Sequence, residues 1–213
     1  MQIGVLGSGM VAQTIGQKLA ELGHAVKLGT RDPRKLDEWL GKVGSGASVG
    51  SFADAAAFGE LLFNCTSGIG SLEALTSAGA ENLAGKVLID VANALDFSRG
   101  MPPTLTVCNT DSLGEQIQRA FPDAKVVKTL NTVNAYLMVN PSLVPGDHDM
   151  FVCGNDAEAK ATVTDILKGW FGWRSVIDLG DISGARGVEM LLPLWVRLWG
   201  VMQSPMFNFK VVR

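Results

Sequence analysis

Residues 2–12 read Gln2-Ile3-Gly4-Val5-Leu6-Gly7-Ser8-Gly9-Met10-Val11-Ala12, a short apolar run that leads directly into a glycine-rich turn. The apolar residues of the run are consecutive rather than alternating, which is typical of a strand covered by helices on both faces. Beyond the turn, Val11, Ile15, Leu19 and Leu22 recur at helical spacing, and Gly23 is a helix-ending residue. The stretch therefore predicts a strand, a tight turn and a helix.

The same alternation of short apolar runs and longer amphipathic segments continues along the chain. The strands we expect are Gln2–Leu6, Ala25–Leu28, Ala47–Val49, Glu60–Asn64, Lys86–Asp90, Lys125–Thr129, Asp149–Cys153 and Ser175–Asp178. Helix starts are indicated by Ser112 with Glu115, before a stop at Pro122, and by Asp156. The pattern predicts an α/β fold of the Rossmann type, with a doubly wound, mainly parallel sheet.

We expect residues 1–213 to form one domain, with residues from about 181 to 213 as a C-terminal helical segment. No stretch is rich enough in Pro, Gly and Ser to act as a linker between domains. The longest irregular stretch, Asp96–Asp111, is interpreted as a surface loop over the carboxyl edge of the sheet.

Composition excludes several classes of protein. The chain has 18 Lys and Arg against 21 Asp and Glu, a net charge of −3, so nucleic acid is not an expected partner. Its three cysteines are far apart, which indicates neither a disulfide framework nor a zinc site. The most apolar stretch, Leu191–Met202, contains Pro193 and Arg197 and is too short to span a membrane. With no export signal at its start, the sequence predicts a cytoplasmic protein without metal or membrane partners.

The glycine-rich turn fits the dinucleotide-binding pattern G-x-G-x-x-G/A in its required place between a strand and a helix. Gly7 allows the tight turn, Gly9 lets a pyrophosphate approach the backbone, and Ala12 lets the helix pack closely on the strand. Free N–H groups at the helix start, from Ser8 to Val11, can then bind phosphate. The alternative is that these glycines only form a turn.

The end of the second predicted strand determines which dinucleotide is expected. An NAD site would place an acid there to accept the ribose hydroxyls, but the sequence has Thr30 and Arg31, with Lys35 one turn into the next helix. A hydroxyl and two cations suit the extra phosphate of NADP(H). The alternative is a solvated charged run in which Asp32 and Pro33 only begin a helix.

Three further strand ends point to the same edge of the sheet. Thr66 and Ser67 are expected near the ribose and diphosphate, and Ala92 and Asn93 near the nicotinamide. Asn131 and Thr132 follow the next strand and complete the set. Each pair alone is an ordinary set of turn residues, and the prediction rests on their recurrence.

Residues for acid–base chemistry are missing from this edge. His24 is expected in a turn between a helix and a strand, and His148 at a strand start, so both are interpreted as structural or solvated. The sequence therefore identifies no catalytic side chain. Hydride transfer from a nicotinamide to another ring depends on proximity and orientation, so this absence favours transfer between two cofactors over carbonyl reduction.

Five segments resemble the NADP oxidoreductase, coenzyme F420-dependent family, which includes the F420H2:NADP⁺ reductase-like proteins. They are Ile3–Gly9, Gly29–Pro33, Asp90–Asn93, Val126–Thr132 and Pro193–Leu198. The resemblance implies an NADPH-dependent oxidoreductase whose small-molecule redox partner is coenzyme F420 or a flavin.

In that family a Thr or Ser, an Arg and a nearby Lys hold the 2′-phosphate, and the matching positions are Thr30, Arg31 and Lys35. Family members often carry Pro after the Asn that follows the fifth strand, whereas Ala94 follows Asn93 here. Because that loop can shape the second site, the departure bears on deazaflavin use.

The C-terminal segment carries the prediction of a homodimer. Trp195, Leu198 and Trp199 widen its apolar face beyond what one sheet covers, as at a subunit interface. The alternative is a helix packed on its own sheet. Two other functions stay open: a regulatory domain that binds NADP(H) without turnover, and a reductase of small carbonyls or imines.

Overall fold

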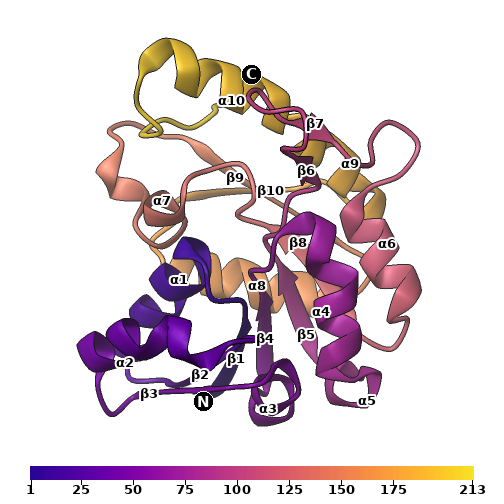
Figure 1. Ribbon diagram of the computed structural model, residues 1–213. Coiled ribbons are helices and arrows are strands. Elements are labelled where there is room, and N and C mark those ends of the chain that lie inside the picture. The colour runs from indigo at the N-terminus through magenta and orange to yellow at the C-terminus, as the bar shows by residue number, and fades with distance from the viewer.

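The computed structural model describes residues 1–213 and is built on one eight-stranded sheet (Figure 1). The strand order is β10-β9-β8-β5-β4-β1-β2-β3. The strands are β1 Gln2–Leu6, β2 Ala25–Gly29, β3 Ala47–Gly50, β4 Leu61–Asn64, β5 Val87–Asp90, β8 Lys125–Thr129, β9 Asp149–Gly154 and β10 Ser175–Asp178. A separate two-stranded ribbon joins β6 Leu95–Asp96 to β7 Thr104–Leu105.

The direction of the strands confirms a mainly parallel, doubly wound sheet. In the sheet order, the strands from β8 across to β3 all pair in parallel with their neighbours. β9 pairs antiparallel with β8, and β10 pairs in parallel with β9. The chain builds outward from β1 through β2 to β3 and then returns to place β4 on the other side of β1. This reversal leaves a crevice beyond the carboxyl ends of β1 and β4, where open α/β sheets bind ligands.

Helices cover both faces of the sheet. The α-helices are α1 Met10–Glu21, α2 Asp37–Val43, α3 Phe52–Phe58, α4 Ser71–Ala78, α5 Ala80–Leu83, α6 Leu113–Ala120, α7 Ala135–Val139, α8 Ala157–Gly169, α9 Ala185–Met190 and α10 Leu192–Met202. The short 3₁₀ helices are η1 Pro33–Leu36, η2 Gly68–Gly70, η3 Pro141–Leu143 and η4 Ile182–Gly184.

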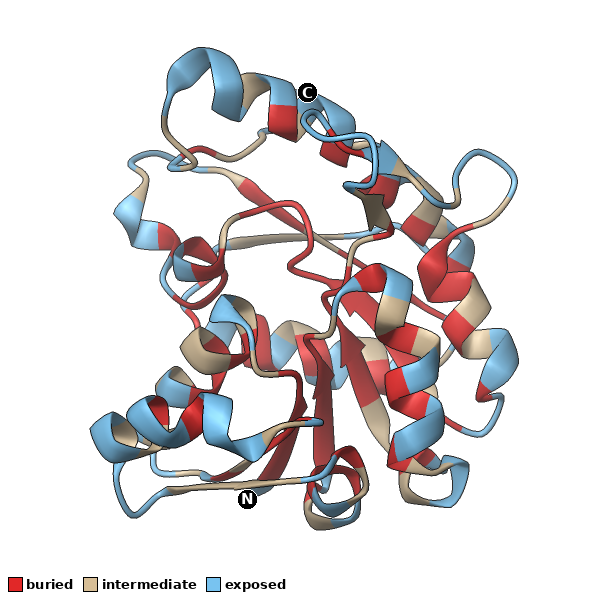
Figure 2. Ribbon diagram, viewed as in Figure 1, coloured by how far each residue is buried: buried red, intermediate tan, exposed pale blue.

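Two apolar cores lie on opposite faces of the sheet. One joins the strands to α1, α2, α7 and α8, and the other joins them to α3, α4, α5 and α6. The central strands are buried along their length (Figure 2), as their consecutive apolar residues predict.

The helix ends follow the capping residues named from the sequence. Gly23 has a φ of +85° just beyond α1, and Asp156 accepts from the backbone N–H of Ala159 at 2.8 Å to begin α8. Ser112 accepts from the N–H of Glu115 at 3.1 Å, but the Glu115 carboxylate accepts from the Ser112 hydroxyl and is paired with Arg186. The Ser112 hydroxyl therefore caps α6 without the reciprocal bond from Glu115, and the Glu189 carboxylate accepts from the first two N–H groups of the helix.

The C-terminal segment lies beyond the carboxyl edge of the parallel strands (Figure 1). The chain breaks at Leu191 after α9, and Pro193 is the second residue of α10, where a helix tolerates proline. After α10 the chain runs extended along the start of β9, where the Asp149 N–H donates to the Phe209 carbonyl at 3.0 Å. No helix of the structure has the length and hydrophobicity that crossing a bilayer requires.

Candidate NADP(H) and redox-partner site

A groove of about 290 Å³ lies at the crevice between β1 and β4. It brings together three of the predicted groups, from the ends of three different strands. They are Gly7, Ser8 and Gly9 after β1, Thr30, Arg31 and Lys35 after β2, and Thr66 and Ser67 after β4. Asp32 and Cys65 also line the groove, and the remaining lining residues lie on helices and carried no signal in the sequence: Phe52, Gly70, Glu73, Ala74 and Ser77.

The glycine turn opens this groove at the start of α1. Gly7 has a φ of +138°, and a Cβ there would lie 2.6 Å from the Cys65 carbonyl oxygen. A Cβ at Gly9 would meet nothing within 4 Å, so the backbone faces open space. The first turn of α1 has no side-chain cap and no acidic residue, which leaves N–H groups from Met10 and Val11 free for an anion.

The end of β2 presents cations without an available acid. Asp32 caps η1 by accepting from the Arg34 N–H, and its carboxylate also accepts from the Arg34 guanidinium at 3.0 Å. Thr30 is buried, and its hydroxyl accepts from the Asp32 N–H at 3.3 Å. Arg31 and Lys35 line the groove and form no ion pair within the chain. This end of the groove therefore has unneutralised positive charge.

Thr66 links the groove to buried polar groups beneath it. Its hydroxyl donates to the Asn64 side-chain oxygen at 2.7 Å and lies 2.7 Å from the Ser71 hydroxyl. The neighbouring Cys65 thiol is buried, which raises its pKa well above the ordinary value. A thiol in that state is unreactive, so Cys65 serves the packing of the groove floor.

The residues predicted at the ends of β5 and β8, of which Ala92 and Asn93 were expected near the nicotinamide, form a second group outside the groove lining. Asn93 donates to the Asn131 carbonyl at 2.9 Å, and the Asn131 amide donates back to the Asn93 side-chain oxygen at 3.0 Å. Asn131 also donates to the Val188 carbonyl of α9 at 3.1 Å. Ala92 and Thr132 are buried beside them, and the Thr132 hydroxyl has no hydrogen-bond partner. The loops after β5 and β8 are thus fixed to each other.

Beneath these loops is an ionic cluster of Asp90, Lys128 and Glu189, which the sequence analysis missed. The Lys128 ammonium lies 2.8 Å from an Asp90 oxygen and 2.9 Å from a Glu189 oxygen, and all three side chains are almost fully buried. Burial opposes the charge on Lys128, but the two carboxylates outweigh it and raise its pKa. Part of the signal was present, because Lys128 interrupts the apolar run of a buried strand, but the pairing with Asp90 follows only from the strand order.

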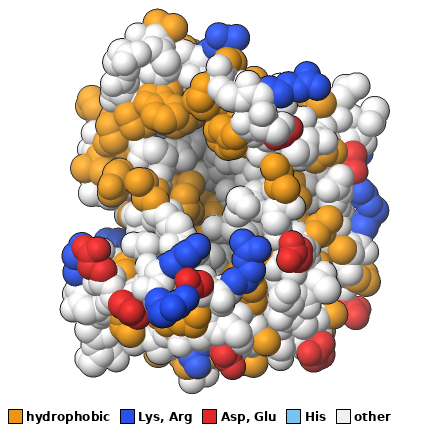
Figure 3. All heavy atoms as spheres, viewed as in Figure 1, with side chains coloured by type: hydrophobic (Ala, Val, Ile, Leu, Met, Phe, Trp, Pro, Cys, Tyr) orange, Lys and Arg blue, Asp and Glu red, His pale blue; other side chains and the backbone are white.

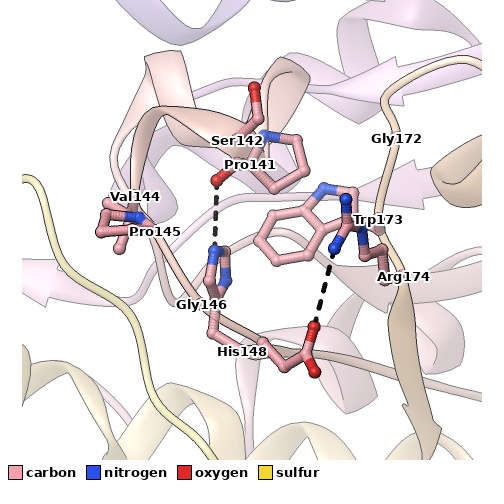
Figure 4. Close-up of a pocket in the computed structure, with 10 residues that line it drawn as sticks. Pro141, Ser142, Val144, Pro145, Gly146, His148, Gly172, Trp173 and Arg174 are labelled. Carbon is pink, nitrogen blue, oxygen red and sulfur yellow. Dashed lines mark hydrogen bonds and ion pairs between the residues drawn. The ribbon is translucent and has the colours of Figure 1, made fainter.

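Neither histidine contacts the groove. The His24 ring packs against the Trp170 ring, with 4.4 Å between the ring centroids. His148 does lie on the carboxyl-edge side of the sheet, contrary to the sequence expectation, because β9 runs antiparallel. It lines a separate cavity of about 250 Å³ with Trp173 and Arg174 (Figure 4), which shares no residue with the groove. Both ring nitrogens of His148 are engaged, with the Pro141 carbonyl at 3.1 Å and the Asn208 amide at 2.9 Å.

One face of the molecule is hollowed between the N-terminal part and the C-terminal segment (Figure 3). Lys and Arg side chains gather on the side of the N-terminal part, and hydrophobic side chains gather on the opposite side, over α7 and α10. Together with the groove, the hollow offers a charged end and an apolar end.

Comparison with known proteins decides the family. The sequence matches the family profile "NADP oxidoreductase coenzyme F420-dependent" over residues 2–94. A crystal structure of a candidate F420-dependent NADP-reductase from Arthrobacter sp. FB24 is 57% identical, covers 100% of both chains and superposes with a TM-score of 0.96. The chain belongs to the F420-dependent NADP oxidoreductase family. The resemblance found in the sequence is therefore confirmed, and with it membership of a family of NADP-dependent oxidoreductases.

Three further proteins resemble the chain at lower identity. The F420-dependent NADP reductase of Methanocaldococcus jannaschii is 33% identical over 119 residues, 55% of this chain and 52% of that protein. Metalloreductase STEAP3 of Rattus norvegicus is 31% identical over 91% of this chain, which spans only 38% of that protein. A reductive aminase from Aspergillus terreus in complex with NADPH is 16% identical, covers 95% of this chain and 62% of the aminase, and has a TM-score of 0.68. That last likeness shows the shared fold alone.

Proposed function

We propose that the protein transfers hydride between NADP(H) and a second, flat redox partner, either coenzyme F420 or a flavin. The observation that carries the proposal is the end of the groove formed by Thr30, Arg31 and Lys35. Two free cations and a buried hydroxyl lie there, and the acid of that segment, Asp32, is engaged by Arg34. A phosphate on the adenosine ribose matches that arrangement, whereas free ribose hydroxyls do not.

With the 2′-phosphate at the end of β2, the other parts of the dinucleotide can be assigned to residues along the groove. The N–H groups from Ser8 to Val11 bind the pyrophosphate, and the open space above Gly9 admits it. Thr66 and Ser67 contact the adjoining ribose. The loops after β5 and β8 lie at the nicotinamide end, where Asn93 is partly exposed while Ala92, Asn131 and Thr132 are buried. The nicotinamide, when bound, supplies the hydride.

The acceptor side favours a flat ring over a small carbonyl. The hollow is bordered by hydrophobic side chains over α7 and α10 (Figure 3), and no histidine lines the groove. Direct hydride transfer between stacked rings requires orientation and exclusion of water rather than a protein acid. The loops after β5 and β8, tied together by Asn93 and Asn131, supply the orientation.

We also propose that the protein is a homodimer that works in the cytoplasm. The outer face of α10 exposes large apolar side chains, with Leu194 51%, Val201 83% and Met202 52% exposed, while only Leu192 and Val196 of the helix are buried. A helix packed only on its own sheet would not need that outer face. Covering it in a dimer would also shield the adjoining hollow from water.

A second candidate function is electron supply to metal ions. The match to the metalloreductases covers 91% of this chain, although the chain spans about two fifths of their length. On this hypothesis the chain delivers electrons from NADPH through a flavin to a ferric chelate.

The test is oxidation of NADPH followed by absorbance, with coenzyme F420, FMN, FAD, and ferric chelates with and without FMN. We expect NADPH oxidation with F420 or a flavin as acceptor. Reduction of the ferric chelates that requires FMN would support the second candidate. Turnover only with a small carbonyl or imine, or with no acceptor, contradicts the proposal. Sedimentation of the wild type and of Val201→Glu tests the dimer: we expect a dimer that the variant dissociates, and a monomeric wild type would contradict it.

A further inference from the structure

The Lys128 ammonium has one buried acceptor for each of its three N–H bonds. They are an Asp90 carboxylate oxygen at 2.8 Å, the Ala92 carbonyl at 2.5 Å and a Glu189 carboxylate oxygen at 2.9 Å. The lysine side chain is 0% exposed. An ammonium group with all its donors used and no access to water is held in one position. Lys128 is therefore a fixed point between β5, β8 and α9.

On one side this fixed point orients the loop after β5. Because Lys128 holds the Ala92 carbonyl inward, the N–H of the same peptide, on Asn93, points in the opposite direction. That N–H has no backbone partner, and the Asn93 side chain is tied to Asn131. The loop thus presents one set orientation of its backbone.

The loop after β8 is held under strain by the same anchors. Leu130 is fully buried and has a φ of +62°, a conformation that residues other than glycine rarely adopt. It lies between Lys128 and Asn131, and the Asn131 amide bonds Asn93 and Val188. Such strain persists where neighbouring contacts over-determine the backbone, and it is concentrated at functional sites.

On the other side Lys128 reaches the C-terminal segment. The Glu189 carboxylate that it contacts also accepts from the backbone N–H groups of Leu113 and Gly114, at 2.8 and 3.0 Å. The chain of buried bonds continues from Asp90 through Asn64 to Thr66 at the groove. One ammonium thus connects the dinucleotide groove, the two loops and α9.

We propose that Lys128 is a positioning residue for hydride transfer, which holds the loops after β5 and β8 and helix α9 in the geometry that brings the nicotinamide to the acceptor. The inference rests on the proposed function. The phosphate-binding end of the groove does not depend on Lys128, since Arg31 and Lys35 belong to the segment after β2. Loss of Lys128 is therefore expected to act on the nicotinamide end and to leave the 2′-phosphate end formed by Arg31 and Lys35 unchanged.

The test compares Lys128→Met and Glu189→Gln with Arg186→Met as a matched control. Arg186 also ties α9 to α6, through Glu115 at 2.8 Å, but contacts neither Lys128 nor the loops. Glu189→Gln keeps the Lys128–Asp90 pair and provides a folded variant if Lys128→Met does not fold. The measurements are the affinity for 2′,5′-ADP, the fluorescence of bound NADPH, and kcat and KM with the acceptor found in the screen.

We expect 2′,5′-ADP to bind all four proteins alike. In Lys128→Met and Glu189→Gln the fluorescence of bound NADPH changes and kcat falls roughly tenfold to a hundredfold, because small misplacements of reacting groups have effects of that size. Arg186→Met is expected to match the wild type. Unchanged kcat and fluorescence in the folded variants, or an equal loss in Arg186→Met, would overturn the positioning role. Failure of the wild type to bind 2′,5′-ADP would instead count against the proposed function.

Discussion

The dinucleotide groove and the Lys128 cluster differ in whether their cationic side chains have partners within the chain. In the groove, Arg31 and Lys35 have no partner within the chain, and the backbone above Gly9 faces open space. In the cluster, Lys128 is fully buried and has three acceptors within the chain. Both regions lie at the same edge of one sheet.

This difference indicates that the groove determines ligand affinity and that the cluster determines the geometry of the loops. Unpartnered cations and N–H groups gain free energy only when an anion arrives, so the groove is built to bind. A cluster whose donors and acceptors are all used gains nothing from a ligand, so its contribution is to hold loops in place. Substitutions in the groove should therefore change ligand affinity, and those in the cluster should change stability and rate.

The largest expected effect is on the stability of Lys128→Met. Removing the ammonium leaves Asp90 and Glu189 buried without their cation, which costs about 3–5 kcal/mol. The melting temperature should fall by about 2–4 °C for each kcal/mol. Thermal unfolding followed by circular dichroism measures this, with Arg186→Met as the half-exposed control. A melting temperature equal to that of the wild type would show that the cluster does not stabilise the fold.

The two turn glycines should respond differently to alanine. Gly7→Ala places a Cβ 2.6 Å from the Cys65 carbonyl at a φ of +138°, so it should lose stability. The backbone strain alone costs about 1–3 kcal/mol. Gly9→Ala has open space for its methyl group and should fold normally, while binding NADPH poorly because the methyl occupies the pyrophosphate position. Melting curves and NADPH titrations check both, and normal affinity in Gly9→Ala would reduce the motif to a turn.

Arg31→Ala should weaken NADPH binding and leave NADH binding little changed. A charge-assisted phosphate contact is worth about 1.5–3 kcal/mol, which corresponds to roughly tenfold or more in affinity. Arg174→Ala is the control, because Arg174 is 86% exposed and lines the separate cavity beside His148 rather than the groove. Titration of both dinucleotides against the three proteins decides the matter. Equal losses for NADPH and NADH in Arg31→Ala would remove the 2′-phosphate assignment.

The smallest effect concerns a surface ion pair between Asp111 and Arg119. The hydrogen bond from Arg119 lowers the pKa of Asp111 to about 2. Because the folded pKa lies below the unfolded value, the stabilisation is present above about pH 4 and is lost as the pH falls toward 2. Since the Arg119 side chain is 60% exposed, the pair contributes at most about 1 kcal/mol. Denaturant unfolding of the wild type and Arg119→Met between these pH values measures the difference. The free energies of unfolding of the two proteins should become equal at the acid end.

Much of the fold and the phosphate end of the site could be predicted from the sequence alone. The eight strands of the sheet lie within a residue or two of their predicted bounds. Gly7, Gly9, Thr30 and Arg31 were identified because each lies within a few residues of a strand end, and all are found in one groove. Turn geometry and helix capping depend on short-range sterics, so neighbouring residues encode them.

Tertiary structure decided the reversal of β9 and the surroundings of the nicotinamide loops. No local pattern shows that β9 runs antiparallel, which moves His148 to the carboxyl-edge side of the sheet. Asp90 and Lys128 are 38 positions apart and meet only because β5 and β8 become neighbours. Glu189 reaches them from α9, and its bonds to Leu113 and Gly114 span more than 70 positions. Pairing of charges at such separations depends on strand order and helix docking, which the chain acquires only when the whole sheet has formed.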